Sequence, residues 1–388
     1  MGRFSKILRT WDPFLLCLIG VVAAASVFPV RGAAAGWTVA LADLAIVMLF
    51  FIHGAKLSRA AIVQGIGNWR LHAMVLGSTY VLFPALGLAL FYAMRGWVNP
   101  LLLSGLLFLS LLPSTVQSSI AFTAIARGNV AAAVCSASLS NLIGIFLTPL
   151  LVALFMHVGG SGGAISSWDS ISKIALQLLA PFLAGHFLRR WIGGFIDRNK
   201  KILQPVDRGS ILIVVYSAFS AAVIKGIWAQ VGVIDLLDLL ALSAVMLAAV
   251  MGATVLAARQ AGLPRADGVV LLFCGSKKSL VSGVPMAGAL FAPAQVGLIV
   301  LPLMIFHQLQ LFVCAVLAAR LRREDDAREA AETIAGSSIP RSDTAIAEAA
   351  AALGMAIPEA CLPGVSANLA LLDEHATVLL GKSDRQAQ

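Results

Sequence analysis

Long apolar tracts are the feature that most limits what this chain can fold into. Hydrophobic residues make up 59% of the 388 residues, and charged residues make up only 12%, well below the roughly 25% of a soluble domain. A helix needs about 20 apolar residues to cross a bilayer, and many tracts approach that length. We therefore expect an all-helical, polytopic membrane protein with ten spans. The predicted spans are 13–30, 36–54, 71–94, 100–126, 130–157, 169–190, 208–229, 234–258, 266–291 and 294–320.

Charge is distributed unevenly along the chain. Residues 1–320 contain 22 Lys and Arg against eight Asp, whereas residues 321–388 contain eleven acidic and six basic residues. With a cytoplasmic N-terminus, 19 basic residues fall in inner segments and four in outer segments, as the positive-inside rule requires. We expect a multi-pass protein of the plasma membrane, the inner membrane in a bacterium, with both termini in the cytoplasm.

Two predicted spans are interrupted at corresponding places. The fourth contains "PSTVQSS", beginning at Pro113, and the ninth contains "CGSKKSLVSG", beginning at Cys274. Each is the fourth helix of a five-helix half, with residues 1–157 as the first repeat and residues 158–320 as the second, inverted repeat. Matching interruptions in inverted repeats indicate a transporter site near the middle of the membrane. The alternative is two helix kinks without function.

Polar residues around the two interruptions are the candidates for a substrate or ion site. Broken helices expose backbone groups, which are tolerated only against protein or a water-filled cavity. Intramembrane polar residues usually face the interior of the bundle, so Asp43 and His307 are candidates for ion coupling. The expected binding residues are Ser114, Thr115, Gln117, Ser118, Ser119, Thr123, Asn141, Ser276, Lys277, Lys278, Ser279 and Gln308.

Lys277 and Lys278 need a specific explanation, because a lysine at membrane depth costs at least ~2.5 kcal/mol. Three roles are open. The lysines could bind an anionic substrate together with the half-helix N-termini, or one could carry a proton, since burial disfavours a charged lysine. They could also be solvated charges in a water-filled cavity. Adjacent helical residues point ~100° apart, so we expect unequal roles unless the backbone is unwound.

The chain from about residue 10 to residue 320 resembles the bile acid:sodium symporter superfamily, in particular its SBF-like branch. The matching segments are "LPSTVQSSIAFTAIARGNVAAA", "SNLIGIFLTPLL" and "FCGSKKSLVSGVPMAGALF". The resemblance implies two inverted five-helix repeats in which broken fourth and ninth helices cross at the site. It also implies secondary-active transport of a small organic anion by alternating access.

The coupling ion stays open between sodium and a proton. The resemblance implies sodium near Ser118, Ser119 and Thr123, but the family's symporters carry an acidic residue where this chain has Phe273 or its neighbour. Hard cations such as sodium prefer oxygen ligands. The ammonium group of Lys277 or Lys278 in place of a carboxylate would repel sodium or occupy its position as an internal cation. We expect no resident cofactor.

The acidic C-terminal part is soluble in character. Residues 321–342 are predicted to be a linker, and residues 343–388 a helical cytosolic tail. Residues 343–381 resemble AtzG-like proteins, which are GatC-like accessory subunits of amidases, through "LGMAIPEACLPGVSANLALLDEHA". The resemblance implies a cytosolic amidase as a partner, and a generic Ala-rich helical tail is the alternative.

Transport is the leading functional interpretation, with a small anionic solute and the lipid bilayer as partners. The sequence contains no recognisable nucleophile–base pair, nucleotide-binding loop or His/Cys metal cluster. We therefore expect neither an enzyme nor a nucleic-acid-binding protein. The alternative is a non-transporting scaffold or regulatory protein of the same fold, whose tail recruits a cytosolic amidase. The missing sodium ligands are the reason to keep that alternative.

Overall fold

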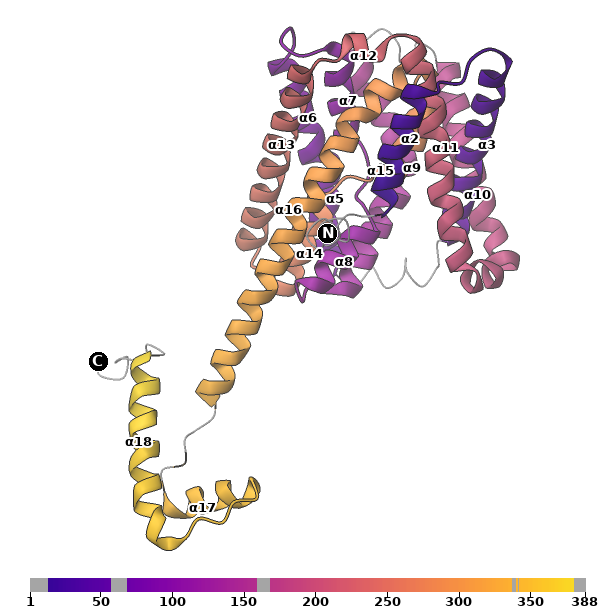
Figure 1. Cartoon of the computed structure of the whole chain (residues 1–388). Helices are drawn as coiled ribbons and strands as arrows, with labels where there is room; N and C mark the ends of the chain where they lie inside the picture. The colour runs from indigo at the N-terminus through magenta and orange to yellow at the C-terminus, as the bar shows by residue number, and fades with distance from the viewer. Residues whose placement is uncertain (1–12, 57–67, 159–167, 337–339, 341, 380–388) are drawn as a thin grey trace. The chain divides into compact units, whose positions relative to one another are not determined.

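The computed structural model describes residues 13–56, 68–158, 168–336, 340 and 342–379 (Figure 1). Within these ranges the chain is helical and contains no β-strand. It divides into two compact units, Met1–Ala319 and Arg320–Gln388. The first unit contains the apolar tracts, and the second contains most of the acidic C-terminal part.

Four helices of the first unit pack on one another and form what we call the first helix group. They are α2 (Pro13–Val27), α3 (Ala33–Lys56), α10 (Trp168–Arg198) and α11 (Lys200–Ile224), of which α3, α10 and α11 lie side by side in Figure 1. The closest approach is between α3 and α10. A Cβ atom on Gly54 would lie 1.9 Å from the Phe182 carbonyl oxygen, and one on Gly185 would lie 2.0 Å from that of Phe51. Small residues allow this approach of two backbones, as they do in many membrane helix pairs.

The remaining long helices of the first unit form the second helix group. Its first part runs from α5 to α9, and its second part runs from α13 to α16. Its elements are α5 (Trp69–Gly77), the π-helix η2 (Ser78–Leu82), α6 (Phe83–Ala93), α7 (Pro100–Ser110), α8 (Gln117–Ile125), α9 (Val130–Val158), α13 (Val233–Gln260), α14 (Arg265–Gly275), α15 (Leu280–Leu290) and α16 (Pro293–Gly336). A short helix, α12 (Ile227–Gln230), precedes α13.

The fourth and ninth predicted spans are broken, as the sequence predicts. Residues 111–116, the first break, separate α7 from α8, and Ser276–Ser279, the second break, separate α14 from α15. Pro113 lacks the N–H that would continue α7. The two breaks touch, because the Ser279 N–H donates to the Pro113 carbonyl (2.9 Å). The segment from α14 to α15 is almost entirely buried, so the second break lies in the interior of the bundle.

The prediction of an all-helical membrane protein is confirmed in its coarse form. Seven helical segments among the described residues are long and apolar enough to cross a membrane, and α7 and residues 16–27 are shorter apolar helices. The arrangement as ten spans in two inverted repeats stays a prediction. The seven segments are 33–56, 69–93, 130–156, 205–224, 233–260, 265–290 and 293–328.

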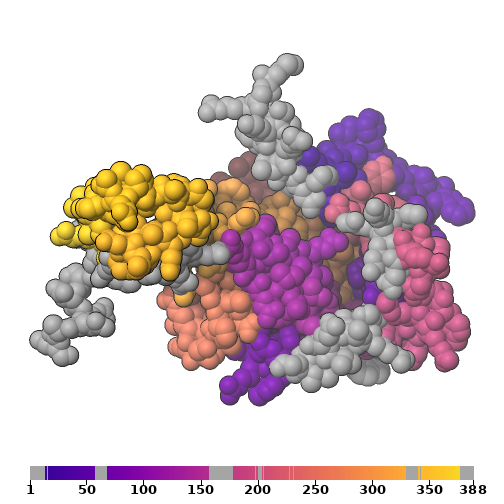
Figure 2. All heavy atoms as spheres, turned by 90° about the horizontal axis from the view of Figure 1, so that it is seen from below, coloured from indigo at the N-terminus to yellow at the C-terminus, as the bar shows by residue number. Residues whose placement is uncertain are grey.

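One face of the first unit joins ends of α5, α9 and α14. In Figure 2 the turn between α8 and α9 lies next to the connection between α13 and α14. The Asn129 N–H donates to the Ala266 carbonyl (3.1 Å). The Asp267 carboxylate accepts from the side-chain amides of Asn129 (2.9 Å) and Asn68 (2.8 Å). These bonds fix α14 at the end opposite its break.

The second unit contains the end of α16, then α17 (Asp343–Ala352), the 3₁₀ turn η3 (Glu359–Cys361) and α18 (Leu362–Leu379). Ser342 caps α17, since its hydroxyl accepts from the Ala345 N–H (3.2 Å), a role that serine favours. Helices α17 and α18 contact each other. The predicted linker is therefore helical up to Gly336, as a continuation of α16.

Candidate functional site

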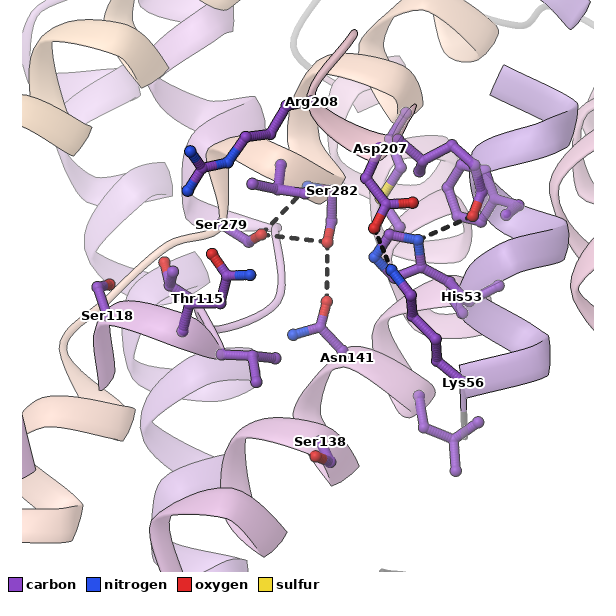
Figure 3. Close-up of a pocket in the computed structure, with 18 of the residues that line it drawn as sticks. His53, Lys56, Thr115, Ser118, Ser138, Asn141, Asp207, Arg208, Ser279 and Ser282 are labelled. Atoms are coloured by element: carbon purple, nitrogen blue, oxygen red, sulfur yellow. Dashed lines mark hydrogen bonds and ion pairs between the residues drawn. The ribbon is translucent and has the colours of Figure 1, made fainter. Parts of the chain in front are cut away.

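A cavity of about 480 Å³ lies between the two helix groups (Figure 3). The first group contributes α2, α3, α10 and α11, and the second contributes the first break, α8, α9, the second break, α15 and α16. The lining residues with polar or charged side chains are His53, Lys56, Thr115, Gln117, Ser118, Ser138, Asn141, Asp207, Arg208, Ser279, Ser282 and His307.

Two helices begin at this cavity. Residues 115–118 line it at the start of α8, and Ser279, Val281 and Ser282 line it at the start of α15. The Ser279 hydroxyl caps α15 by accepting from the Ser282 N–H (3.1 Å). The first N–H groups of a helix have no partner within the helix and carry its positive dipole end. Both helix starts therefore favour a negatively charged group in the cavity.

Charged side chains line the cavity on the side of the first helix group. Lys56 at the end of α3 forms an ion pair with Asp207 of α11, and the second Asp207 oxygen, Oδ1, is buried without a hydrogen-bond partner in the described structure. The Arg208 guanidinium lies 5.5 Å from the centre of the Phe14 ring. Lys56 and Arg208 therefore outnumber Asp207, the one acidic residue in the described lining.

Asn141 of α9 connects the first break to the start of α15 at the cavity wall (Figure 3). Its side-chain oxygen accepts from the Ser282 hydroxyl (2.8 Å), and its NH₂ group donates to the Ser114 carbonyl (2.7 Å). The Ser282 hydroxyl in turn accepts from the Ser279 hydroxyl (3.1 Å). One amide thus holds the first break and the start of α15 in register.

Hydroxyl groups of the first broken helix bond to carbonyls of the second. The Ser114 hydroxyl donates to the Cys274 carbonyl (2.5 Å), and the Ser119 hydroxyl donates to that of Phe273 (3.0 Å). The Thr115 hydroxyl donates to the Lys278 carbonyl (2.7 Å). Buried carbonyls at a helix end need such partners, so these three hydroxyls hold the crossing together.

Lys278 is fully buried and directs its ammonium away from the cavity. The Nζ atom donates to the carbonyls of Thr79 (2.8 Å), Ser110 (2.8 Å) and Leu112 (2.6 Å). It also lies 4.2 Å from the centre of the Phe83 ring. All three N–H groups of the ammonium therefore have an acceptor.

Lys277 is also fully buried, but it has a different environment. Its Nζ atom lies 3.9 Å from the centre of the Phe122 ring and 5.7 Å from that of Phe273. It has no hydrogen-bond partner among the described residues. Aromatic faces are thus the contacts seen for this ammonium, and the two adjacent lysines are not equivalent.

The structure brings about half of the predicted site residues to the cavity. The predicted residues that line it are Thr115, Gln117, Ser118, Asn141, Ser279 and His307. The predicted residues outside its lining are Asp43, Ser114, Ser119, Thr123, Ser276, Lys277, Lys278 and Gln308.

The residues outside the lining have varied surroundings. The Ser276 hydroxyl donates to the Leu272 carbonyl (2.5 Å). The Thr123 hydroxyl and the Gln308 NH₂ group are buried without a partner in the described part of the chain. Asp43 lines a separate cavity of about 30 Å³. No cluster of three or more His, Cys, Asp or Glu side chains is found within the described ranges.

Sequence reasoning missed six polar cavity residues and one buried glutamine. Ser138 and Ser282 line the cavity from α9 and α15. Lys56 and Asp207 line it because α3 and α11 extend beyond the apolar tracts, and His53 and Arg208 lie at the ends of those tracts. Charges within two turns of a span end were the available signal.

Gln310, and not Gln308, contacts the second break. Its NH₂ group donates to the Lys278 carbonyl (2.9 Å) and to His307 Nδ1 (2.8 Å), and its oxygen accepts from the Lys278 N–H (2.9 Å).

Comparison with known proteins shows the family of this chain. The chain is 53% identical over 325 residues to "Putative symporter YfeH" of Escherichia coli (strain K12), which covers 84% of this chain and 97% of the relative. It is 55% identical over 320 residues to "Uncharacterized protein PA2026" of Pseudomonas aeruginosa, covering 82% and 96%. It is 26% identical over 332 residues to "Sodium/bile acid cotransporter 7-A" of Xenopus laevis, covering 83% and 94%. The profile of the SBF-like CPA transporter family (DUF4137) matches residues 12–323. The protein is thus a membrane transporter and not an enzyme, and it belongs to the SBF-like CPA transporter family.

Proposed function

We propose that the protein is a secondary-active transporter that carries a small organic anion through the cavity between the two helix groups. The observation that carries this proposal is the convergence of two half-helix N-termini on a cavity that also contains Arg208 and Lys56. Helix N-termini and cationic side chains both stabilise a negative group. One acidic residue, Asp207, opposes them within the described lining.

The other cavity walls support an anion with an apolar body. Phe14, Phe50 and Phe182 come from the first helix group, and Leu142 and Ile145 come from α9. A volume of about 480 Å³ lies in the range of sites that bury most of a small molecule. We infer a solute that places its carboxylate or sulfonate at the helix starts and its apolar part against the aromatic side chains.

Alternating access would move one helix group against the other around this cavity. The cavity is bounded by both groups, and α15 contacts α3, α10 and α11 of the first group. We infer ten spans in two inverted repeats, in the bacterial inner membrane with both termini cytoplasmic, from the spacing of the apolar tracts and the distribution of basic residues. Transporters of that kind place the solute at the repeat interface.

Sodium or a proton would drive the uptake. Ser118 and Thr123 of α8 have buried hydroxyl oxygens without a partner in the described structure, which are the type of ligand that sodium prefers. His307, an expected coupling residue, lines the cavity and is the candidate for carrying a proton. Uptake driven by a sodium gradient or by a pH gradient, each imposed alone, separates the two.

The experiment is uptake of labelled carboxylates and sulfonates into proteoliposomes that contain the full chain. Arg208→Gln should reduce uptake about tenfold or more, since a hydrogen bond to a charged group contributes about 1.5–3 kcal/mol. Arg190→Gln is the matched control, because Arg190 is exposed, stacks near Trp191 and does not line the cavity. Equal uptake by wild type and Arg208→Gln would refute the role of Arg208.

The second unit supports a separate proposal, a docking role for residues 343–381. Leu353, Met355, Leu371 and Leu372 are large apolar residues exposed on it. We infer that they bind a cytosolic amidase of the kind that uses an AtzG-like subunit. Co-elution of the full chain with such an amidase, and its loss in Leu371→Ser/Leu372→Ser, would support this role. Amidase binding without uptake of any solute would favour a scaffold over a transporter.

A further inference from the structure

We propose that the Lys278 ammonium is a tethered cation that fills a monovalent-cation site made of three backbone carbonyls. The site is formed by Thr79 of η2, Ser110 at the end of α7 and Leu112 in the first break. The prediction is that removing this side chain opens a site for a free monovalent cation. The inference does not depend on which solute the protein carries, or on whether it carries one.

The three carbonyl oxygens converge on one point. They lie 2.8, 2.8 and 2.6 Å from Lys278 Nζ, and the ammonium is fully buried. Each oxygen carries partial negative charge, so three of them around one buried point repel one another unless a positive charge lies between them. A cation at this point, covalently attached or free, therefore stabilises the first break more than a neutral donor would.

The sequence leaves these carbonyls without backbone donors. In η2 the Phe83 N–H donates to the Ser78 carbonyl, five residues back. In the same register the donor for Thr79 would be residue 84, which is Pro84 and has no N–H. At the end of α7, the Ser114 N–H donates to the Ser140 hydroxyl (3.0 Å) and not to the Ser110 carbonyl. Two prolines, Pro84 and Pro113, thus accompany the carbonyls that Lys278 contacts.

The surroundings of the ammonium are those of a bound cation and not of an ion pair. No carboxylate forms an ion pair with Lys278 in the described ranges. The group lies at the C-terminal end of α7, where the helix dipole is negative, and over the face of Phe83 at 4.2 Å. Backbone carbonyl rings are also the ligands that bind potassium in channel filters.

Lys277 supplies the internal comparison. It is the next residue in the chain and is equally buried, with a relative exposure of 0% for both lysines. Its ammonium has no hydrogen-bond partner in the described structure and lies over the Phe122 ring. Removing Lys277 therefore deletes a buried charge without exposing a set of convergent carbonyls. An effect of free cations should be confined to variants of Lys278.

The experiment measures thermal unfolding of the full chain in detergent, in choline, sodium, potassium or ammonium chloride at equal ionic strength. Wild type and Lys277→Ala should show the same differences in unfolding temperature among the four salts, including any stabilisation by a coupling ion. Lys278→Ala should unfold at a lower temperature in choline, and a small cation should restore about 2–4 °C with a saturable concentration dependence. The salts that restore stability identify which cation fits the three carbonyls.

Two results would overturn the inference. The first is a folded Lys278→Ala protein whose unfolding temperature responds to the four salts as that of the wild type does. The second is an equal response to cations in Lys277→Ala, which would assign the effect to buried charge in general. A second readout, recovery of a monodisperse protein after solubilisation, covers a variant that does not fold in choline. Recovery in potassium, sodium or ammonium supports the inference, and failure in every salt, for both Lys278→Ala and Lys278→Gln, contradicts it.

Discussion

The crossing of α3 and α10 gives a prediction whose size follows from the structure. In Gly54→Ala, the new Cβ would lie 1.9 Å from the Phe182 carbonyl oxygen, whereas real Cβ contacts are essentially never under 3.0 Å. The two backbones must therefore separate by about 1.1 Å. A gap of 0.5–1 Å already loses about a quarter to a half of the dispersion energy of the atoms concerned, and overpacking typically costs about 1–3 kcal/mol.

We expect Gly54→Ala to destabilise the protein by about 2 kcal/mol, because a backbone clash costs about 3 kcal/mol, the upper end of the overpacking range, and alanine gains ~0.5–1 kcal/mol over glycine in a helix. With an unfolding entropy of about 2.1 cal/mol/K per residue, the 388 residues correspond to a fall in Tm of roughly 2–3 °C. The assay is thermal unfolding of the detergent-solubilised protein at a fixed scan rate, since such unfolding is commonly irreversible. Uptake should fall as well, because His53 and Lys56 on the same helix line the cavity.

Two further variants make the reasoning refutable. Gly36→Ala lies in the same helix with nothing within 4 Å of its Cβ position, so it should be neutral or slightly stabilising. Gly185→Ala clashes at the same crossing, 2.0 Å from the Phe51 carbonyl oxygen. Once one substitution has separated the helices, the second should cost less, so the double variant should be less destabilised than the sum. Equal Tm values for Gly36→Ala and Gly54→Ala would refute the close approach.

Two further predictions concern the charge of the cavity lining and the N-terminal cap of α15. Asp207→Asn removes the one acidic side chain of the described lining and the partner of Lys56. The anion should therefore bind several-fold more tightly, as measured by KM for uptake, and weaker binding would contradict the electrostatic reasoning. Ser279→Ala deletes the cap of α15, so stability should fall by about 1 kcal/mol, and an unchanged Tm in thermal unfolding would argue against the cap.

The sequence was sufficient to locate the crossing but not to assign the chemistry at it. Pro113 and the polar run from Gly275 to Ser279 mark both breaks, because proline and polar residues interrupt an apolar helix visibly. The partners of Lys278 could not be predicted, since the Thr79 carbonyl becomes available only through a π-helical turn that tertiary packing selects. Lys278 and Thr79 lie 199 residues apart in the sequence, and no local sequence pattern predicts a contact between them.

Helix length and helix phase explain the other differences. Hydropathy marks the apolar part of a helix but not its end, so it predicts a span that begins at Arg208 and leaves Asp207 in a connection, although α11 begins at Lys200. Phase decides between the two glutamines that follow His307. Gln310 lies three residues after His307 on the same helical face and bonds to it, whereas Gln308 points elsewhere. A period of 3.6 residues applied to this short run would have selected Gln310.

The Asn141 amide also makes the two half-helices dependent on each other. Its oxygen accepts from Ser282 beside the start of α15, while its NH₂ group donates to Ser114 in the first break. An amide cannot exchange these two functions by turning over, because its oxygen would then face the Ser114 carbonyl. A solute that takes the Ser282 hydroxyl as its own donor would therefore release Asn141 from α15 and leave it attached to the first break. The same side chain can thus transmit the occupancy of one helix start to the other without any movement of α9.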